Sequence, residues 1–189
     1  MTEALVQIPD DFYRRIEARV RSRIVRELRS ARRIVDIGCG DCELARLLEQ
    51  SGTDRDVIGI DVSDAAFPKA HSLGKRLRCI KADARRLAFP RSAEVDAVVL
   101  LHSLHELAAP MACLRQARRL LGPGGEILVV DFPKGSLAQR LWNEDYYTTG
   151  EVAAMLKRAG FAGIRATRTE RRQLTWARAF KPRKGRSSR

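Results

Sequence analysis

Short apolar runs alternate with stretches of helical periodicity along most of this chain. The runs predict four strands, at 34–37, 57–60, 78–81 and 95–101, and most of their residues are apolar and β-branched, as in strands covered on both faces. Residues 12, 16, 20, 24 and 28 are apolar, and this spacing of four predicts an amphipathic helix from Phe12 to about Ser30. The alternation indicates an α/β protein built around a parallel sheet.

The second half of the chain continues the pattern less regularly. We expect helices over about 41–50, 65–73, 109–121 and 149–159, and further strands over 126–132, 164–169 and 174–180. Thr148 and Glu151 have the spacing of a capping box, which marks the start of the last helix. Residues 134–147 show no clear period but concentrate aromatic side chains, and 181–189 form a basic tail that we expect to be disordered.

The first strand leads into a glycine turn, and the next strands end in acidic residues. Gly38 and Gly40 allow a sharp turn close to a ligand, and Asp41 can cap the helix that follows. Asp61 ends the second strand 21 residues after Gly40, near the spacing expected of a carboxylate that binds ribose hydroxyls. Asp83 follows the third strand. Because parallel strands end at one edge of a sheet, these groups predict a nucleotide-type site there.

Taken in order, these segments resemble the class I S-adenosylmethionine-dependent methyltransferases. The residues that carry the resemblance are 35–40, Asp61, Ala82-Asp83, 95–101 and 120–131. The resemblance spans about residues 10–180. It implies a doubly wound α/β fold with a seven-stranded, mostly parallel sheet, an antiparallel last strand and helices on both faces. Two positions depart from related patterns: Cys42 stands where the family often has glycine, and Glu43 stands where a nicotinamide-binding fingerprint needs glycine.

The resemblance also implies a domain plan and a cofactor site. We expect one methyltransferase domain over 1–180, with an N-terminal helix at 10–31 that either covers the donor pocket or only packs against the sheet. Residues 134–147 are a candidate lid. The cofactor is S-adenosylmethionine, and no metal is expected. The predicted donor-binding residues are Asp36, Gly38, Cys39, Gly40, Asp61, Val62, Asp83, Ala84 and Leu100.

Two histidines follow the fourth strand, where family members place residues that face the acceptor. His102 and His105 are therefore the predicted catalytic residues, since a histidine can take a proton from an oxygen or nitrogen acceptor near neutral pH. A purely structural role in the loop is the alternative. The Asn/Asp-Pro-Pro-aromatic motif of enzymes that methylate base amines is replaced here by Leu101-His102-Ser103-Leu104. A small-molecule acceptor is therefore the favoured interpretation.

The net charge of +13 lies at the two ends of the chain. Residues 34–133 carry 13 basic and 14 acidic side chains, whereas 134–189 carry 14 and 4. Basic ends keep an RNA methyltransferase open as an alternative, and a cofactor-binding protein without catalysis is a third. No apolar run reaches the roughly 18 residues that cross a bilayer. The N-terminus lacks the pattern of a signal peptide, so we expect a cytoplasmic protein with no membrane partner. The oligomeric state is not predicted.

The cysteines leave a further alternative open. Cys39 and Cys42 form a C-x-x-C at a helix start, which is compatible with a redox pair. The other interpretation makes them small residues beside the cofactor loop, with Cys79 and Cys113 as buried apolar side chains.

Overall fold

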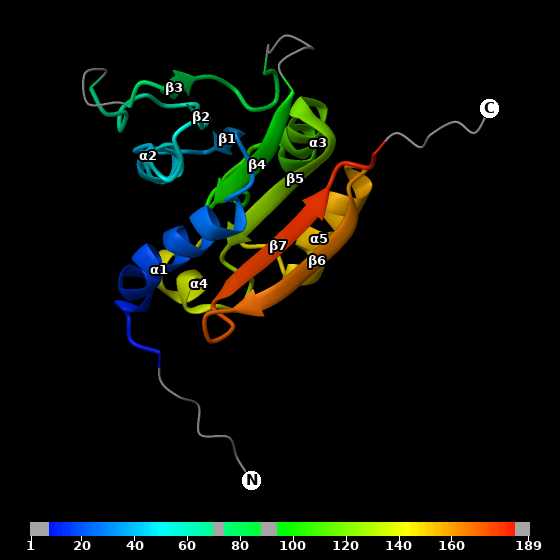
Figure 1. Cartoon of the computed structure of the whole chain (residues 1–189). Coiled ribbons are helices and arrows are strands. Elements are labelled where there is room, and N and C mark those ends of the chain that lie inside the picture. The colour runs from blue at the N-terminus through cyan, green and yellow to red at the C-terminus, as the bar shows by residue number, and fades with distance from the viewer. Residues whose placement is uncertain (1–7, 70–73, 88–93, 184–189) are drawn as a thin grey trace, which may run out of the picture.

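The computed structural model describes residues 8–69, 74–87 and 94–183 (Figure 1). The helices are α1 (Phe12–Glu27), α2 (Glu43–Gln50), α3 (Pro110–Leu120), α4 (Leu137–Trp142) and α5 (Thr149–Arg158). The strands are β1 (Arg33–Ile37), β2 (Asp56–Asp61), β3 (Leu77–Lys81), β4 (Val95–Leu101), β5 (Leu121–Asp131), β6 (Ala162–Thr169) and β7 (Leu174–Phe180).

All the strands join one seven-stranded sheet in the order β3-β2-β1-β4-β5-β7-β6. The first five strands in that order pair in parallel, and β7 runs antiparallel to both β5 and β6. This confirms the predicted fold class. The chain reverses its direction of winding between β1 and β4, and ligands bind in open α/β sheets at such a switch point.

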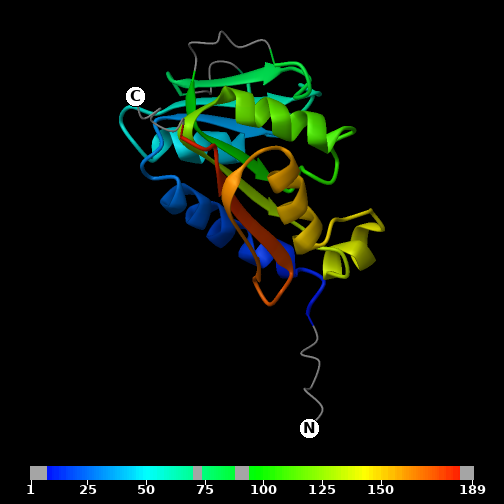
Figure 2. The same ribbon diagram turned by 90° about the vertical axis from the view of Figure 1, so that its right-hand side faces the viewer.

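Helices cover both faces of the sheet (Figure 2). The helices α1, α2 and α4 contribute to one apolar cluster, and α3 and α5 contribute to the other. The sequence of β1 does not alternate between apolar and polar residues, because both faces of the strand are covered. Ile34 faces the first cluster and Val35 the second, and both are almost fully buried. The amphipathic α1 turns its predicted apolar positions, from Phe12 to Leu28, into the first cluster.

Three elements differ from the sequence-based expectation. Residues 65–69 form a turn rather than the start of a helix, and 70–73 lie outside the described residues. Side-chain bonds within this segment favour the turn, since the Ser63 hydroxyl accepts from the N–H of Ala65. β5 begins at Leu121, earlier than predicted, because the backbone of Gly124 and Gly125 pairs with Lys181 and so extends the strand through the glycine-rich segment.

The short helix α4 was not predicted, because six residues carry too little periodicity. Side chains from distant parts of the chain accept hydrogen bonds from the N–H groups in its first turn. The side-chain oxygen of Gln173 accepts from the N–H of Leu137 at 2.7 Å, and the Tyr13 hydroxyl accepts from that of Ala138 at 3.0 Å. Figure 1 accordingly shows α4 beside the start of α1. The capping box of Thr148 and Glu151 at α5 is confirmed.

The basic tail was predicted over 181–189, and its residues 184–189 lie outside the described part of the chain. Within the described ranges, no helix combines the length and apolarity needed to cross a membrane.

Candidate active site

The carboxyl ends of β1, β2, β3 and β4 surround a cavity of about 180 Å³. Five of the predicted donor-binding residues line it: Gly38, Asp61, Val62, Asp83 and Ala84. The other lining residues are Ile37, Ile60, Ala82, Arg85, Ser103, Glu106, Leu107, Ala108 and Cys113. The cavity therefore lies at the edge of the sheet where the sequence predicted a nucleotide-type site.

Gly38 must be glycine for two reasons. Its φ of +74° lies in the left-handed region that favours glycine, and a Cβ there would come within 2.4 Å of the Ser103 Cβ. Ser103 cannot retreat freely, because its hydroxyl donates a hydrogen bond of 2.7 Å to the carbonyl of Ile37. The end of β1 and the loop after β4 are thus locked together at the floor of the cavity.

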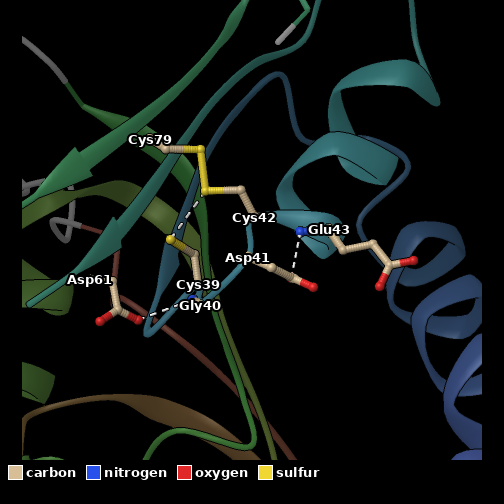
Figure 3. The surroundings of a disulfide bond; sticks show 7 residues. All are labelled: Cys39, Gly40, Asp41, Cys42, Glu43, Asp61 and Cys79. Atoms are coloured by element: carbon tan, nitrogen blue, oxygen red, sulfur yellow. Dashed lines mark hydrogen bonds between the residues drawn. A yellow bond between two sulfur atoms is a disulfide. The ribbon is translucent and has the colours of Figure 1, made fainter. Parts of the chain in front are cut away.

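Gly40 holds the loop against the end of β2. Its backbone N–H donates to Asp61 Oδ2 at 3.0 Å, and no atom lies within 4 Å of the position where a Cβ would stand (Figure 3). The predicted cap residue Asp41 accepts from the N–H of Glu43 at 3.0 Å, while the N-cap position itself belongs to Cys42. The loop therefore presents open backbone beside a carboxylate.

Asp36 is a buried carboxylate at the end of β1. It is 1% exposed, and its Oδ1 has no hydrogen-bond partner among the described residues. Burial raises the pKa of Asp36 to about 7, although Arg21 of α1 acts in the opposite direction. A buried carboxylate oxygen without a partner is costly, so its presence beside an open glycine loop fits a cationic group of a ligand. The ammonium group of S-adenosylmethionine meets that requirement.

Asp83 and Arg85 border the cavity beyond β3. Arg85 contacts the carboxylate of Asp83 through Nε at 2.8 Å and holds the pKa of Asp83 at about 2. Asp83 therefore stays an acceptor at neutral pH. Ala84 is buried beside it, and Val62, which also lines the cavity, is 70% exposed and so leaves an apolar side chain available to a ligand.

The N-terminal helix α1 brings charged side chains to the same end of the sheet. Arg21 donates to Glu17 at 2.8 Å and also contacts Glu43 of α2. Burial raises the pKa of Glu17, but His102 and Arg21 outweigh it and lower the pKa overall. His102 Nε2 lies 3.5 Å from Glu17 Oε2. The helix thus packs against the sheet and brings Arg21 near Asp36. The described cavity is lined by none of its residues, so a cover over the donor pocket stays a prediction.

His105 is held by a buried carboxylate from the end of β5. Its Nδ1–H donates to Asp131 Oδ1 at 2.8 Å, and its backbone N–H donates to Asp131 Oδ2 at 3.0 Å. Both side chains are nearly buried, at 5% and 3% exposure. Burial alone lowers the pKa of His105, but the hydrogen bond to Asp131 and the nearby carboxylates raise it overall. The pair thus fixes Nδ1 as a nitrogen that carries a proton and turns Nε2 away from Asp131.

The Nε2 side of His105 faces residues of the irregular segment. Glu144 Oε2 lies 3.2 Å from Nε2, and the Tyr146 hydroxyl donates to the same oxygen at 3.0 Å. Glu106 Oε1, at the rim of the donor cavity, lies 3.9 Å from Nε2. His105, Glu106 and Glu144 also offer ligand atoms within 4.8 Å of one another, which makes them the group in the described ranges that could hold a metal ion.

Aromatic rings surround the two histidines. His102 stacks on Phe132 with centroids 4.2 Å apart, and Tyr146 lies 4.6 Å from His105. Tyr13 of α1 and Trp142 of α4 extend the group, with Trp142 5.0 Å from Phe132. Trp142 is 46% exposed, so this aromatic cluster opens to solvent on one side.

The cysteines do not pair as the C-x-x-C suggests. A disulfide joins Cys42 to Cys79 on β3, while Cys39 and Cys113 are free and buried. The expectation that Cys79 is a buried apolar side chain is wrong, since it is bonded and only half-buried. Cys39 and Cys42 both lie in the turn between β1 and α2, and because Cys42 is bonded, neither interpretation of the C-x-x-C describes it in full.

The structure separates the predicted residues into three groups. Those that line the cavity are described above. Asp36, Cys39 and Gly40 lie in or under the loop, and Leu100 is buried in the core below it. His102 and His105 lie after β4, in contact with Phe132 and Asp131 at the end of β5. Asp131, Glu144 and Ser103 carry no signal in the sequence that marks them as site residues, because only the fold brings them to His105 and to the end of β1.

Comparisons with known proteins agree with this geometry. Residues 35–129 match a family model described as a methyltransferase domain. The demethylmenaquinone methyltransferase of Thermus thermophilus is 32% identical over 109 residues, covering 56% of this chain and 49% of that protein. The 27-O-demethylrifamycin SV methyltransferase of Amycolatopsis mediterranei is 35% identical over 111 residues, covering 56% of this chain and 40% of that protein. The chain thus spans about half the length of these relatives.

Solved structures share the fold over most of the chain. Human N-acetylserotonin methyltransferase in complex with SAM superposes with a TM-score of 0.71 at 18% identity, covering 92% of this chain and 53% of that one. A putative methyltransferase of Haloferax volcanii, in complex with the Trm112 activator, gives 0.71 at 17% identity and covers 93% and 95%. With the matched family model and the geometry of the strand ends, these findings establish that the chain belongs to the class I S-adenosylmethionine-dependent methyltransferases.

Proposed function

We propose that this protein transfers the methyl group of S-adenosylmethionine to a small molecule that presents an aromatic ring and an ionisable hydroxyl. The observation that carries the proposal is the His105–Asp131 pair, which lies among aromatic side chains and next to the rim of the donor cavity. The two relatives named above methylate small molecules by their names, and this supports a small acceptor.

The donor supplies a methyl group on a sulfonium, which leaves readily, so the protein has mainly to bind, align and exclude water. Asp36 would accept from the donor's ammonium group, since its Oδ1 is buried and unpartnered in the described structure. Asp61 would accept from the ribose hydroxyls. Asp83, kept ionised by Arg85, would accept from the adenine amino group. Gly38 and Gly40 would let the loop backbone approach the donor closely.

His105 would take the proton from the acceptor hydroxyl through Nε2. Asp131 is a positioning residue, because it orients the ring through two hydrogen bonds and stabilises the imidazolium that forms. Glu144 occupies the Nε2 position in this structure and is 49% exposed at its side chain, so an acceptor can displace it. His102 would serve as a wall of the acceptor site, since its ring is stacked on Phe132.

Residues 134–147 would form the lid over this acceptor site. The segment carries Trp142, Glu144 and Tyr146, and α4 within it is tied to Tyr13 of α1. It therefore links the N-terminal helix to the acceptor side. Trp142 and Leu141 are the exposed apolar side chains of the segment, and an acceptor could cover them.

The test is a methyl-transfer assay on a panel of phenols and hydroquinols, with products measured by mass spectrometry. We expect His105→Gln to lower kcat for a weakly acidic phenol by about 100-fold or more, the usual contribution of a general base. A phenol acidic enough to be ionised at the assay pH is the matched control, because it needs no base and should lose little rate. Equal losses for both phenols would contradict the role of His105.

The pH profile tests Asp131 separately. Since the pKa of His105 is raised above 6.5, kcat should rise with pH through a value above 6.5 as the ring loses its proton. Asp131→Asn removes the carboxylate that raises this pKa, so the rise should move to lower pH while the maximum falls. A profile that stays in place would show that Asp131 does not act through His105.

A further inference from the structure

Three cysteines meet at the donor loop, residues 38–42, of which two belong to the loop and one to a neighbouring strand (Figure 3). Cys39 lies in the loop itself, Cys42 is the N-cap residue of α2, and Cys79 belongs to β3. Cys42 and Cys79 form a disulfide, and Cys39 Sγ lies 3.4 Å from Cys42 Sγ. The bond therefore connects the donor loop to a strand two positions away in the sheet.

The intervening strand β2 leaves room for this bond at Gly59. Gly59 pairs in register with Cys79, so it lies between the loop and β3. A Cβ at Gly59 would come within 2.8 Å of Cys39 Sγ and 3.0 Å of Cys42 Sγ. Any other residue would push the sulfurs apart, so the absence of a side chain at this point of β2 lets the three cysteines meet.

The surroundings favour the Cys42–Cys79 bond over one within the C-x-x-C. Burial raises the pKa of the Cys39 thiol well above its usual range, and Asp36 and Asp61 raise it further. A thiol that stays protonated is a poor nucleophile, because the thiolate is the attacking species. Since Cys42 is bonded, the Cys39 S–H is the donor in the 3.4 Å contact between their sulfurs.

The disulfide constrains the backbone that faces the donor. Cys42 has a φ of +59°, a left-handed conformation that is unfavourable for a residue with a side chain. The 37-residue separation between the two cysteines places Asp61 inside the ring that the bond closes. Figure 3 shows the Gly40–Asp61 hydrogen bond of 3.0 Å beside the cross-link, and both of its residues belong to the predicted donor site.

We propose that Cys42 and Cys79 are a reversible redox-modification site that sets the affinity for the methyl donor by fixing the Gly38–Cys42 loop. The inference rests on the proposed function only in naming the donor as the ligand. A small-molecule disulfide oxidises the site: the two protein thiols lose two protons and two electrons, the S–S bond forms, and two small thiols are released. A dithiol reverses this step by becoming a cyclic disulfide, and it leaves Cys42 and Cys79 as thiols.

The experiment prepares the full chain in two states, oxidised with oxidised glutathione and reduced with dithiothreitol. Alkylation in denaturant followed by mass spectrometry should find Cys39 and Cys113 labelled in the oxidised protein and all 4 cysteines labelled in the reduced protein. Peptide mapping should join Cys42 to Cys79. Calorimetric titration with S-adenosylmethionine should then give about three- to tenfold weaker binding to the reduced protein, because the loop loses its preorganisation.

Two variants make the comparison specific. Cys79→Ser should bind the donor like the reduced protein and should not respond to dithiothreitol. Cys113→Ser should keep the ratio between oxidised and reduced affinities, whatever its own affinity. Equal affinities in the two states of the unmodified chain, or a mapped Cys39–Cys42 bond, would overturn this inference and leave the proposed function standing. Absence of donor binding in both states would overturn the proposed function, and with it this inference, which takes the methyl donor as its ligand.

Discussion

Replacing Asp36 by asparagine should stabilise the fold and weaken donor binding at the same time. The pKa of this carboxyl is about 7 in the folded protein, against about 3.9 in an unfolded chain. The folded state therefore holds a proton that the unfolded state has lost, and stability falls as the pH rises from about 4 to about 7. Three pKa units correspond to about 4 kcal/mol of lost stability at pH 8.

The side-chain amide introduced by Asp36→Asn would carry no charge and would avoid this cost. At pH 8 we expect the free energy of unfolding of the variant to exceed that of the unmodified protein by up to about 4 kcal/mol, or about 2–4 °C in Tm per kcal/mol. At pH 4.5 the two proteins should differ little. The dissociation constant for S-adenosylmethionine should rise at least about tenfold, since a charge-assisted hydrogen bond to the ammonium is lost.

Denaturant unfolding at several pH values, with donor titrations in parallel, measures both effects. Asp54→Asn is the matched control, because Asp54 is 66% exposed at its side chain and pairs at the surface with Arg76 at 3.4 Å. It should change stability by less than about 1 kcal/mol and leave donor binding unchanged. A destabilised Asp36→Asn at pH 8, or one that binds the donor normally, would refute the reasoning.

The remaining predictions concern two glycines of the donor loop and Asp61 at the end of β2. Gly38→Ala should destabilise the fold by about 2–4 kcal/mol, because its Cβ would meet Ser103 in a left-handed backbone; denaturant unfolding measures this, and a cost below about 1 kcal/mol would contradict it. Gly40→Ala should cost only about 1 kcal/mol, since nothing lies near its Cβ, yet it should weaken donor binding; unchanged affinity would show that the donor does not approach there. Asp61→Ala should weaken donor binding well over tenfold by calorimetry, and an unchanged constant would remove Asp61 from the site.

Local pattern was enough to predict most of the fold. β-branched apolar runs and spacing of four marked β1, β2, β4 and α1, and the family resemblance added the antiparallel β7, which the strand pairing confirms. Two of the three differences share a physical cause. α4 and the turn at 65–69 are decided by side chains that bond to the backbone, such as Tyr13 from another element, and these bonds leave little periodic trace.

The donor side of the site was easier to predict than the acceptor side. Gly38, Gly40 and Asp61 belong to one strand–turn–helix–strand unit, so their spacing along the chain fixes their positions in space. Asp131 and Glu144 reach His105 only because β5 lies beside β4 and the following segment folds back over both. The disulfide likewise depends on the register of Gly59 with Cys79, which no spacing within the C-x-x-C could indicate.

Two alternatives from the sequence have tests of their own. The basic surplus over 134–189 keeps RNA open as an acceptor, and weaker binding of an RNA with added salt would support it, since phosphate contacts release counterions. A cofactor-binding protein without catalysis also remains an alternative. It predicts a bound donor and no methyl transfer to any acceptor in the panel.

The cavity at the carboxyl ends of β1, β2, β3 and β4 is the predicted binding site of S-adenosylmethionine. Calorimetric titration of the purified protein with S-adenosylmethionine and, separately, with NAD tests it most directly. We predict micromolar-range binding of S-adenosylmethionine and none of NAD, because Glu43 stands where a nicotinamide-binding turn needs glycine. Binding of NAD alone, or of neither compound, would contradict the assignment of the donor site.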